Sequence, residues 1–155
     1  MKIHTYERAF LWLGAATLVA CMAALVYGTI GLGIHLPGHA GSIDPEKVAT
    51  TAPFDQPGVR QVGPNAYEAV IIGRIWSFTP AQIEVPAGAD VTFTLTTPDV
   101  IHGFHIEGTR VNMMLIPGQV TRNHYRFERP GEYAILCHEY CGVGHHTMHA
   151  KVIVR

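Results

Sequence analysis

The sequence predicts an all-β domain of the sandwich or barrel type that follows one N-terminal transmembrane helix. Two observations carry this prediction. Residues 9–34 contain no Lys, Arg, Asp or Glu, whereas residues 67–155 consist of short runs rich in β-branched and aromatic residues, separated by turn residues. With 155 residues, the chain has room for one modest domain and such a helix.

The uncharged stretch 9–34 is long enough to cross a bilayer. As a helix it would extend about 39 Å, at roughly 1.5 Å per residue, against ~30 Å for the hydrocarbon core. Trp12 and Tyr27 lie near its two ends, where interfacial aromatic residues are common. A cleaved signal peptide is the alternative, but the stretch exceeds the apolar region of about 7–15 residues that signal peptides have.

The charges that flank this stretch predict its orientation. Lys2 and Arg8 precede it, and the first ionised residue after it is Asp44. Because positive residues favour the cytoplasmic side, we expect residues 1–8 in the cytoplasm. Residues 9–34 would then span the membrane once, and everything after them would lie on the outer face.

The remaining residues predict a linker and then strands. Residues 35–66 are rich in Pro and Gly, which indicates a linker that packs only loosely on the domain formed by residues 67–155. Val91, Phe93 and Leu95 alternate with threonines, as in a half-buried strand. Strands at this spacing are typical of an antiparallel sandwich or barrel. Further strands are predicted at 67–76, 83–85, 120–127, 132–136 and 151–155.

One short segment near the C-terminus concentrates metal-binding side chains. Cys137 and Cys141 are followed by His145 and Met148, and His102 stands upstream at the end of a predicted strand. Thiolate, thioether and imidazole together form a soft ligand set. Such a set favours copper over magnesium, calcium or manganese.

Several arrangements of these residues remain open. Cys137 and Cys141 could form a disulfide in an oxidising compartment, but this leaves the spacing of the histidine and methionine unexplained. A tetrahedral zinc site could use both cysteines and two histidines, but it has no use for Met148. A mononuclear copper site needs two His, one Cys and a weak axial Met, which leaves one cysteine surplus. Two cysteines on one loop can instead bridge two metal ions.

The pattern C-x-E-x-C-G-x-x-H-x-x-M at 137–148, preceded by D-V-x-H at 99–102, resembles the binuclear CuA site of cytochrome c oxidase subunit II. The resemblance extends over the whole chain. It implies a cupredoxin-like Greek-key fold for residues 67–155. Three further segments closely resemble the B-type (ba-type) branch of this haem–copper oxidase family: 83–86, 98–108 and 129–133.

The resemblance also implies a ligand set in which both cysteines bridge two copper ions, and each ion takes one histidine and one weaker ligand. In part of the family, the carboxylate at the position of Glu139 also reaches a magnesium or manganese ion at the subunit interface; a solvated carboxylate is the alternative. The implied ligands are Cys137 and Cys141 for both ions, His102 and Met148 for one ion, and His145 with the backbone carbonyl of Glu139 for the other.

The function implied by the resemblance is electron transfer from cytochrome c, through copper, to the haem of subunit I. That subunit would reduce oxygen to water and pump protons, while this chain relays electrons without catalysing oxygen reduction itself. The expected setting is the plasma membrane of a prokaryote, with the copper domain on the periplasmic side. Two alternatives remain open: the CuA subunit of a nitric oxide reductase, and a membrane-anchored cupredoxin that carries electrons outside an oxidase.

The charge balance limits the choice of partners. A formal net charge of −1 provides no field for binding nucleic acid. Residues 35–155 carry nine Lys or Arg against eleven Asp or Glu, so strong steering of a basic cytochrome is not expected. We therefore expect a largely apolar docking patch near the copper loop, with Trp76 and Phe78 as candidates for accepting the electron. Ordinary positions in the core are the alternative for both aromatic residues.

Overall fold

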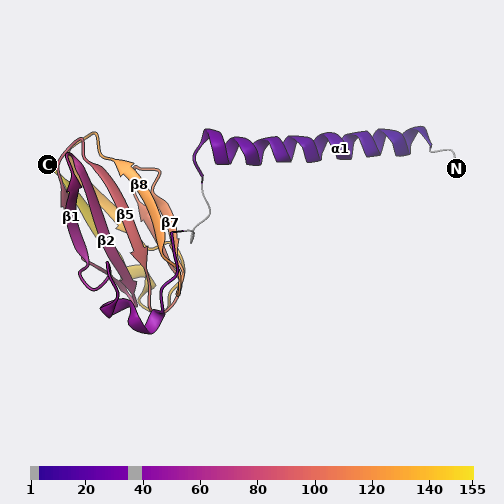
Figure 1. The fold of residues 1–155 in the computed structure, drawn as a ribbon. Coiled ribbons are helices and arrows are strands. Elements are labelled where there is room, and N and C mark those ends of the chain that lie inside the picture. Colours follow the sequence, from indigo (N-terminus) through magenta and orange to yellow (C-terminus); the bar gives the residue numbers. More distant parts are fainter. Residues whose placement is uncertain (1–3, 35–39) are drawn as a thin grey trace. The chain divides into compact units, whose positions relative to one another are not determined.

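The computed structural model describes residues 4–34 and 40–155. They divide into a helical unit and a β domain, shown in Figure 1. Among these residues, α1 is the one α-helix, as expected. Two short 3-10 helices lie in the β domain, at Pro45–Thr50 and His145–Thr147.

Helix α1 (Thr5–Val26) continues into a π-helical turn at Tyr27–Gly31. It begins ahead of the predicted stretch 9–34 because Glu7 accepts a hydrogen bond from the backbone N–H of His4, at 3.0 Å, and so caps the first turn. It ends before Gly33, whose φ of +63° does not continue a helix. The resulting helix is long and apolar enough to cross a membrane.

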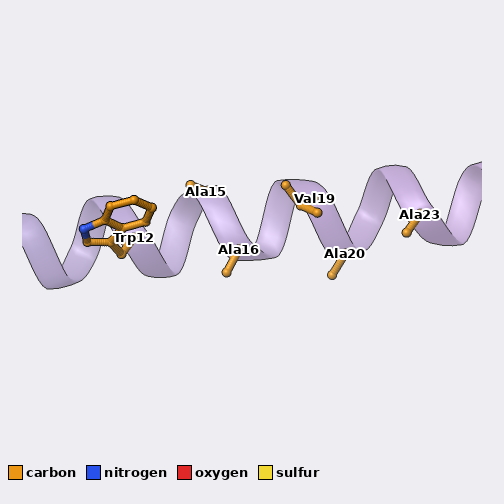
Figure 2. A pocket seen from close by; sticks show the side chains of 6 residues that line it. All are labelled: Trp12, Ala15, Ala16, Val19, Ala20 and Ala23. Atoms are coloured by element: carbon orange, nitrogen blue, oxygen red, sulfur yellow. The ribbon is translucent and has the colours of Figure 1, made fainter.

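A shallow apolar groove runs along one side of α1, next to the ring of Trp12 (Figure 2). Small side chains make this groove, and in a membrane they allow the backbone of another helix to approach closely. The lining residues are Trp12, Ala15, Ala16, Val19, Ala20 and Ala23.

The β domain consists of two five-stranded sheets. The first has the order β1–β2–β5–β8, with β3 also paired to β2, and Figure 1 shows these four strands side by side. The second has the order β4–β10–β9–β6–β7. The bounds in the first sheet are β1 Gly58–Gly63, β2 Ala66–Arg74, β3 Ser77–Thr79, β5 Asp90–Thr96 and β8 Thr121–Arg126. Those in the second are β4 Gln82–Val85, β6 His102–Ile106, β7 Asn112–Leu115, β9 Gly131–Leu136 and β10 His149–Val154.

The predicted sandwich is confirmed, but each sheet contains one parallel pair, so the strands are not antiparallel throughout. Strands β2 and β5 pair in parallel, with Ala69 opposite Phe93, and β4 pairs in parallel with β10, with Ile83 opposite Val152. The chain leaves the first sheet after β3, forms β4 in the second, and returns as β5. Alternation of apolar residues reports which face of a strand is buried, and it carries no information on this exchange between sheets.

The core between the sheets is rich in aromatic rings that meet edge to face or tilted. The ring centroid of Phe104 lies 5.4 Å from that of Phe78 and 5.9 Å from that of Phe93, which in turn lies 6.3 Å from that of Phe127. Such pairs contribute about 0.5–1.5 kcal/mol each beyond the burial of their area. The same cluster includes both cysteines of the C-terminal loop and Met148. The candidate metal ligands are therefore an extension of the core.

The segment 35–66 differs from the loose linker that its composition predicts. Its described part, from residue 40 on, includes β1, and it buries Val48 and Phe54 against the face of β2 that points away from the main core. The backbone N–H of Ile43 also donates to the carbonyl of Gly118, at 3.1 Å. Because these apolar residues are irregularly spaced among prolines and glycines, no periodic pattern reveals that they pack. Residues 35–39 lie outside the described part.

Candidate metal centre

Neighbouring strands of the second sheet bring the candidate ligands to one end of the sandwich. His102 is the first residue of β6, Cys137 follows β9, and Met148 precedes β10. The sheet places β9 between β6 and β10, so these three positions meet. The backbone N–H of Cys137 donates to the carbonyl of Met148, at 3.2 Å, and closes the loop that carries Cys141 and His145.

The ligand atoms of the predicted set converge on one point. The Sγ atoms of Cys137 and Cys141 lie 3.8 Å apart, and both cysteines are free. The Sγ atom of Cys141 lies 3.5 Å from Nδ1 of His145 and 3.7 Å from Sδ of Met148. The ligand atoms of His102 and the two cysteines all lie within 4.8 Å of one another.

The backbone carbonyl of Glu139 also faces this cluster, since it accepts a hydrogen bond from Sγ of Cys137, at 3.3 Å. The structure therefore brings together all six of the residues that the sequence predicts as ligands. The carbonyl of Glu139 is thus directed toward the cysteines, while the residue as a whole is half-buried.

Four of the six candidate ligands are buried, namely His102, Cys137, Cys141 and Met148, and a ring nitrogen of His102 has no hydrogen-bond partner in the described residues. His102 is fully buried, and its Nε2 bonds Oδ1 of Asp99 at 2.8 Å, whereas its Nδ1 has no partner in the described residues. A buried polar atom left without a partner costs about 1–3 kcal/mol. A metal ion between this nitrogen and the two sulfur atoms would remove that cost. Together with the thioether of Met148, the donor set fits copper.

The pKa values of Cys141 and of Asp99, which contacts His102, are shifted in opposite directions. Burial raises the pKa of the Cys141 thiol to about 11, with a contribution from the charge of neighbouring Cys137. A thiol in this position keeps its proton at neutral pH unless a metal ion displaces it. Burial also acts to raise the pKa of Asp99, but hydrogen bonds from His102 and from the backbone outweigh it and hold that pKa below its usual value.

An aromatic side chain covers the ligand loop. The indole N–H of Trp76 donates to the carbonyl of Cys141, at 3.1 Å, and the ring lies against the backbone of Gly142 and Gly144. A Cβ atom at Gly144 would overlap the ring. Trp76 is 41% exposed, whereas Phe78 is 2% exposed and belongs to the aromatic core. Of the two aromatic candidates for electron transfer, only Trp76 therefore reaches the surface beside the loop.

Other histidines near the loop are not part of the cluster. His138 and His146 are exposed, although they adjoin ligands in the sequence, and Nδ1 of His149 bonds the carbonyl of Thr147 at 2.9 Å. In residues 4–34 and 40–155, the one group of three or more potential metal-binding side chains is that of His102 and the two cysteines.

The sequence analysis assigned no role to Asp99 or to Gly144. In the structure, Asp99 contacts the candidate ligand His102, and Gly144 lies against the ring of Trp76. A signal for Asp99 is present, because an acidic residue three positions before a candidate ligand histidine is well placed to bond its second ring nitrogen. No comparable signal exists for Gly144, whose importance depends on the distant residue Trp76.

The fold and the site define a cupredoxin domain with a copper-binding donor set, in a chain with one apolar helix that could span a membrane. The family model of the cytochrome c oxidase subunit II periplasmic domain matches residues 75–154. The cytochrome c oxidase subunit 2 of Thermus thermophilus is 40% identical over 99% of this chain and 94% of the relative. The chain therefore belongs to the cytochrome c oxidase subunit II family.

Solved structures agree with this assignment. The chain is 38% identical to one from a heme-copper terminal oxidase dimer, with a TM-score of 0.75, over 97% of this chain and 99% of that one. It also shares its fold with the periplasmic domain of subunit II of cytochrome oxidase from Bradyrhizobium japonicum, at 19% identity and a TM-score of 0.52, over 57% of this chain and 83% of that domain.

These findings confirm the resemblance and the cupredoxin fold predicted from the sequence. The chain is a subunit of a haem–copper terminal oxidase, a respiratory enzyme complex. The comparisons do not favour a free-standing electron carrier or the subunit of a nitric oxide reductase.

Proposed function

We propose that this subunit holds the binuclear copper centre, CuA, and relays electrons from cytochrome c to the haem of subunit I. The observation that carries the proposal is the pair of free cysteines on one loop, with Sγ atoms 3.8 Å apart and other donors on either side. A single metal ion needs only one of these thiolates in a copper site of the mononuclear type. Two ions use both.

The ligands divide between the two ions as the family resemblance implies. Cys137 and Cys141 would hold both ions. His102 and Met148 would serve one ion, and His145 with the carbonyl of Glu139 would serve the other. Bound there, the copper pair would supply one-electron transfer.

The chain itself keeps the donors fixed and excludes substrate. Both cysteines, His102 and Met148 are buried, so no position is open to a reacting molecule. The hydrogen bond between Cys137 and Met148 and the aromatic core hold the loop on a rigid sheet. Donors that move little when the oxidation state changes favour fast electron transfer at a small driving force.

We assign the contact with cytochrome c to an apolar surface around Trp76. Beside Trp76, the side chains of Ile75, Tyr140 and Val143 are exposed on the same loops. Glu139 is the one acidic residue between positions 137 and 148, and there are no lysines or arginines there. A surface of this composition suits a partner that docks mainly by burying apolar area, with Trp76 as the point at which the electron arrives.

The helix and its flanking charges support a setting in the membrane. Residues 1–8 would lie in the cytoplasm, 9–34 in the plasma membrane of a prokaryote, and the copper domain on the periplasmic side. The alanine-lined groove of α1 would accept a helix of subunit I. The carboxylate of Glu139 is a candidate ligand for magnesium or manganese at the interface with that subunit.

Electron paramagnetic resonance of the copper-loaded, oxidised protein tests the proposal. An electron shared between two copper nuclei gives a seven-line hyperfine pattern, whereas one nucleus gives four lines. We expect seven lines and two copper ions per chain by metal analysis. Four lines with one copper ion, or zinc in place of copper, would refute the binuclear assignment.

A further inference from the structure

Asp99 is surrounded by hydrogen-bond donors. Its Oδ1 accepts from the backbone N–H of Val100 at 2.6 Å and from the hydroxyl of Thr97 at 2.8 Å. Its Oδ2 accepts from the backbone N–H of Ile75 at 2.8 Å. A backbone N–H can only donate, so both oxygens are held as acceptors.

This arrangement determines which nitrogen of His102 carries hydrogen. Nε2 of His102 lies 2.8 Å from Oδ1 of Asp99, and an acceptor oxygen requires a donor there. A neutral imidazole has one N–H, so Nδ1 is left with its lone pair. Nδ1 is the buried atom that has no partner in the described residues, and a ring nitrogen of His102 lies within 4.8 Å of both cysteine sulfur atoms. Because Nε2 is bonded to Asp99, Nδ1 is the nitrogen that remains free to bind copper.

The same carboxylate also reaches the aromatic side chain over the loop. Ile75, which donates to Oδ2 of Asp99, directly precedes Trp76, and Trp76 donates to the carbonyl of Cys141. A continuous set of contacts therefore runs from His102 through Asp99 to Trp76 and back to the cysteine loop. Asp99 therefore connects His102, at the start of β6, to the segment Ile75–Trp76, whose indole ring covers the loop that carries the cysteines.

We propose that Asp99 is a positioning residue, which sets the tautomer and orientation of His102 for copper and fixes the segment that carries Trp76. The inference rests on the proposed copper site, because it assigns Asp99 a part in building it. Carboxylates that bond the second nitrogen of a ligand histidine fix the orientation of the ring and raise its basicity, and their loss weakens metal binding by about 10- to 100-fold.

The first experiment measures the tautomer without metal. The full chain, in detergent and labelled with 15N-histidine, is studied by long-range proton–nitrogen correlation at a pH where histidines are neutral. The signals of His102 are those missing from a His102→Gln variant. In the wild type we expect hydrogen on Nε2 alone, and in Asp99→Ala a mixture of both tautomers. Hydrogen on Nδ1 in the wild type, or an unchanged tautomer in Asp99→Ala, overturns the proposal.

The second experiment measures copper affinity by competition with a chelator. We expect Asp99→Ala to bind copper about 10- to 100-fold more weakly than the wild type. Asp90→Asn, a change of an exposed aspartate on β5, should bind like the wild type. Equal affinity in Asp99→Ala and the wild type overturns the proposal.

Asp99→Asn keeps the test decisive if the alanine variant does not fold. Asparagine replaces one acceptor oxygen by an NH₂ donor, so either His102 or Ile75 loses its acceptor, and copper affinity should again fall below that of Asp90→Asn. Copper binding by neither the wild type nor any variant would refute the proposed function, and the tautomer of the metal-free wild type would still decide the role of Asp99.

Discussion

The indole N–H of Trp76 donates a hydrogen bond to the main-chain carbonyl of Cys141, over a distance of 3.1 Å. A ring that is 41% exposed is thereby joined directly to a proposed bridging cysteine. Such a contact would give an arriving electron a short path from the protein surface to the proposed copper centre. It also ties the conformation of the ligand loop to the position of the ring.

Replacing Trp76 by alanine should slow reduction of the protein by cytochrome c. An aromatic hot spot at an interface contributes about 2 kcal/mol or more, so we expect a fall of about 30-fold or greater in the second-order rate constant. Stopped-flow measurement of copper reduction checks this, with Trp12→Ala in α1 as the matched control. An unchanged rate in Trp76→Ala would exclude this surface as the docking site.

Added salt should change the association rate with cytochrome c only weakly. The surface around Trp76 presents apolar side chains, and charge steering requires complementary fields that this surface lacks. The rate constant measured across a series of ionic strengths should therefore remain within a few-fold, on the order of the variation seen without steering. A steep decline as salt is added would show that charged residues elsewhere guide the encounter.

Substituting Met148 by leucine should shift the reduction potential and leave both copper ions bound. Met148 is buried and its Sδ lies 3.7 Å from Sγ of Cys141, a position suited to a weak axial ligand that tunes the potential. Met113→Leu, at a buried position of β7, is the matched control and should leave the potential unchanged. Loss of all copper from Met148→Leu would contradict an axial role.

Changing Cys137 to alanine should abolish the binuclear signal. A centre bridged by two thiolates cannot share an electron in the same way through one, so the seven-line spectrum should disappear. Cys21→Ala, in the apolar helix, serves as the control and should keep the signal of the wild type. Persistence of seven lines in Cys137→Ala would mean that this cysteine is not a bridging ligand.

Glu68 should stabilise the β domain in a pH-dependent manner. Burial acts to raise its pKa, but hydrogen bonds from Arg60 and Thr94 and the charges of Arg60 and Arg122 outweigh it, so the pKa lies below the ordinary value of 4.5. A carboxylate with a lowered pKa stabilises the fold above the pKa of the unfolded chain. This contribution is lost as the pH falls through the folded pKa.

Glu68→Gln should therefore lower the free energy of unfolding at neutral pH, and the difference from the wild type should shrink as the pH falls below about 4.5. Urea unfolding at several pH values measures it. Glu84→Gln is the control, since Glu84 forms a surface ion pair with Arg155 and an exposed hydrogen bond with Gln82, and exposed pairs contribute little. A difference that grows toward acidic pH would show that the carboxylate is not stabilised in the fold.

The candidate metal site could be recognised in the sequence because five of its six proposed ligands lie in one loop of twelve residues, 137–148. Only His102 is distant, and the sequence predicts it at the end of a strand, whereas the structure places it at the start of β6. By contrast, Trp76 and Phe78 looked equivalent, since both are aromatic and two residues apart. Strand β3 is only three residues long, Ser77–Thr79, so Trp76 lies outside it and escapes the alternation that buries Phe78.

The parallel pairing of β2 with β5 and the packing of Val48 and Phe54 could not be predicted from local patterns. Both depend on which distant segments meet. The parallel pairing follows from the exchange of the chain between the two sheets. The packing of Val48 and Phe54 covers the second apolar face of β2, which would otherwise be exposed to water. Neither the parallel pairing nor this packing alters the pattern of apolar residues along the segments involved, so the sequence pattern does not reveal them.

The second apolar cluster determines where a soluble fragment of this subunit can begin. A truncation at residue 67 would remove β1 and uncover Val70 and Ile72, and exposing a buried aliphatic side chain costs about 1.5–3 kcal/mol. It would also leave β2 with an unpaired edge open to association with other chains. Removal of the hydrophobic helix for work in aqueous buffer is therefore best made ahead of Ile43.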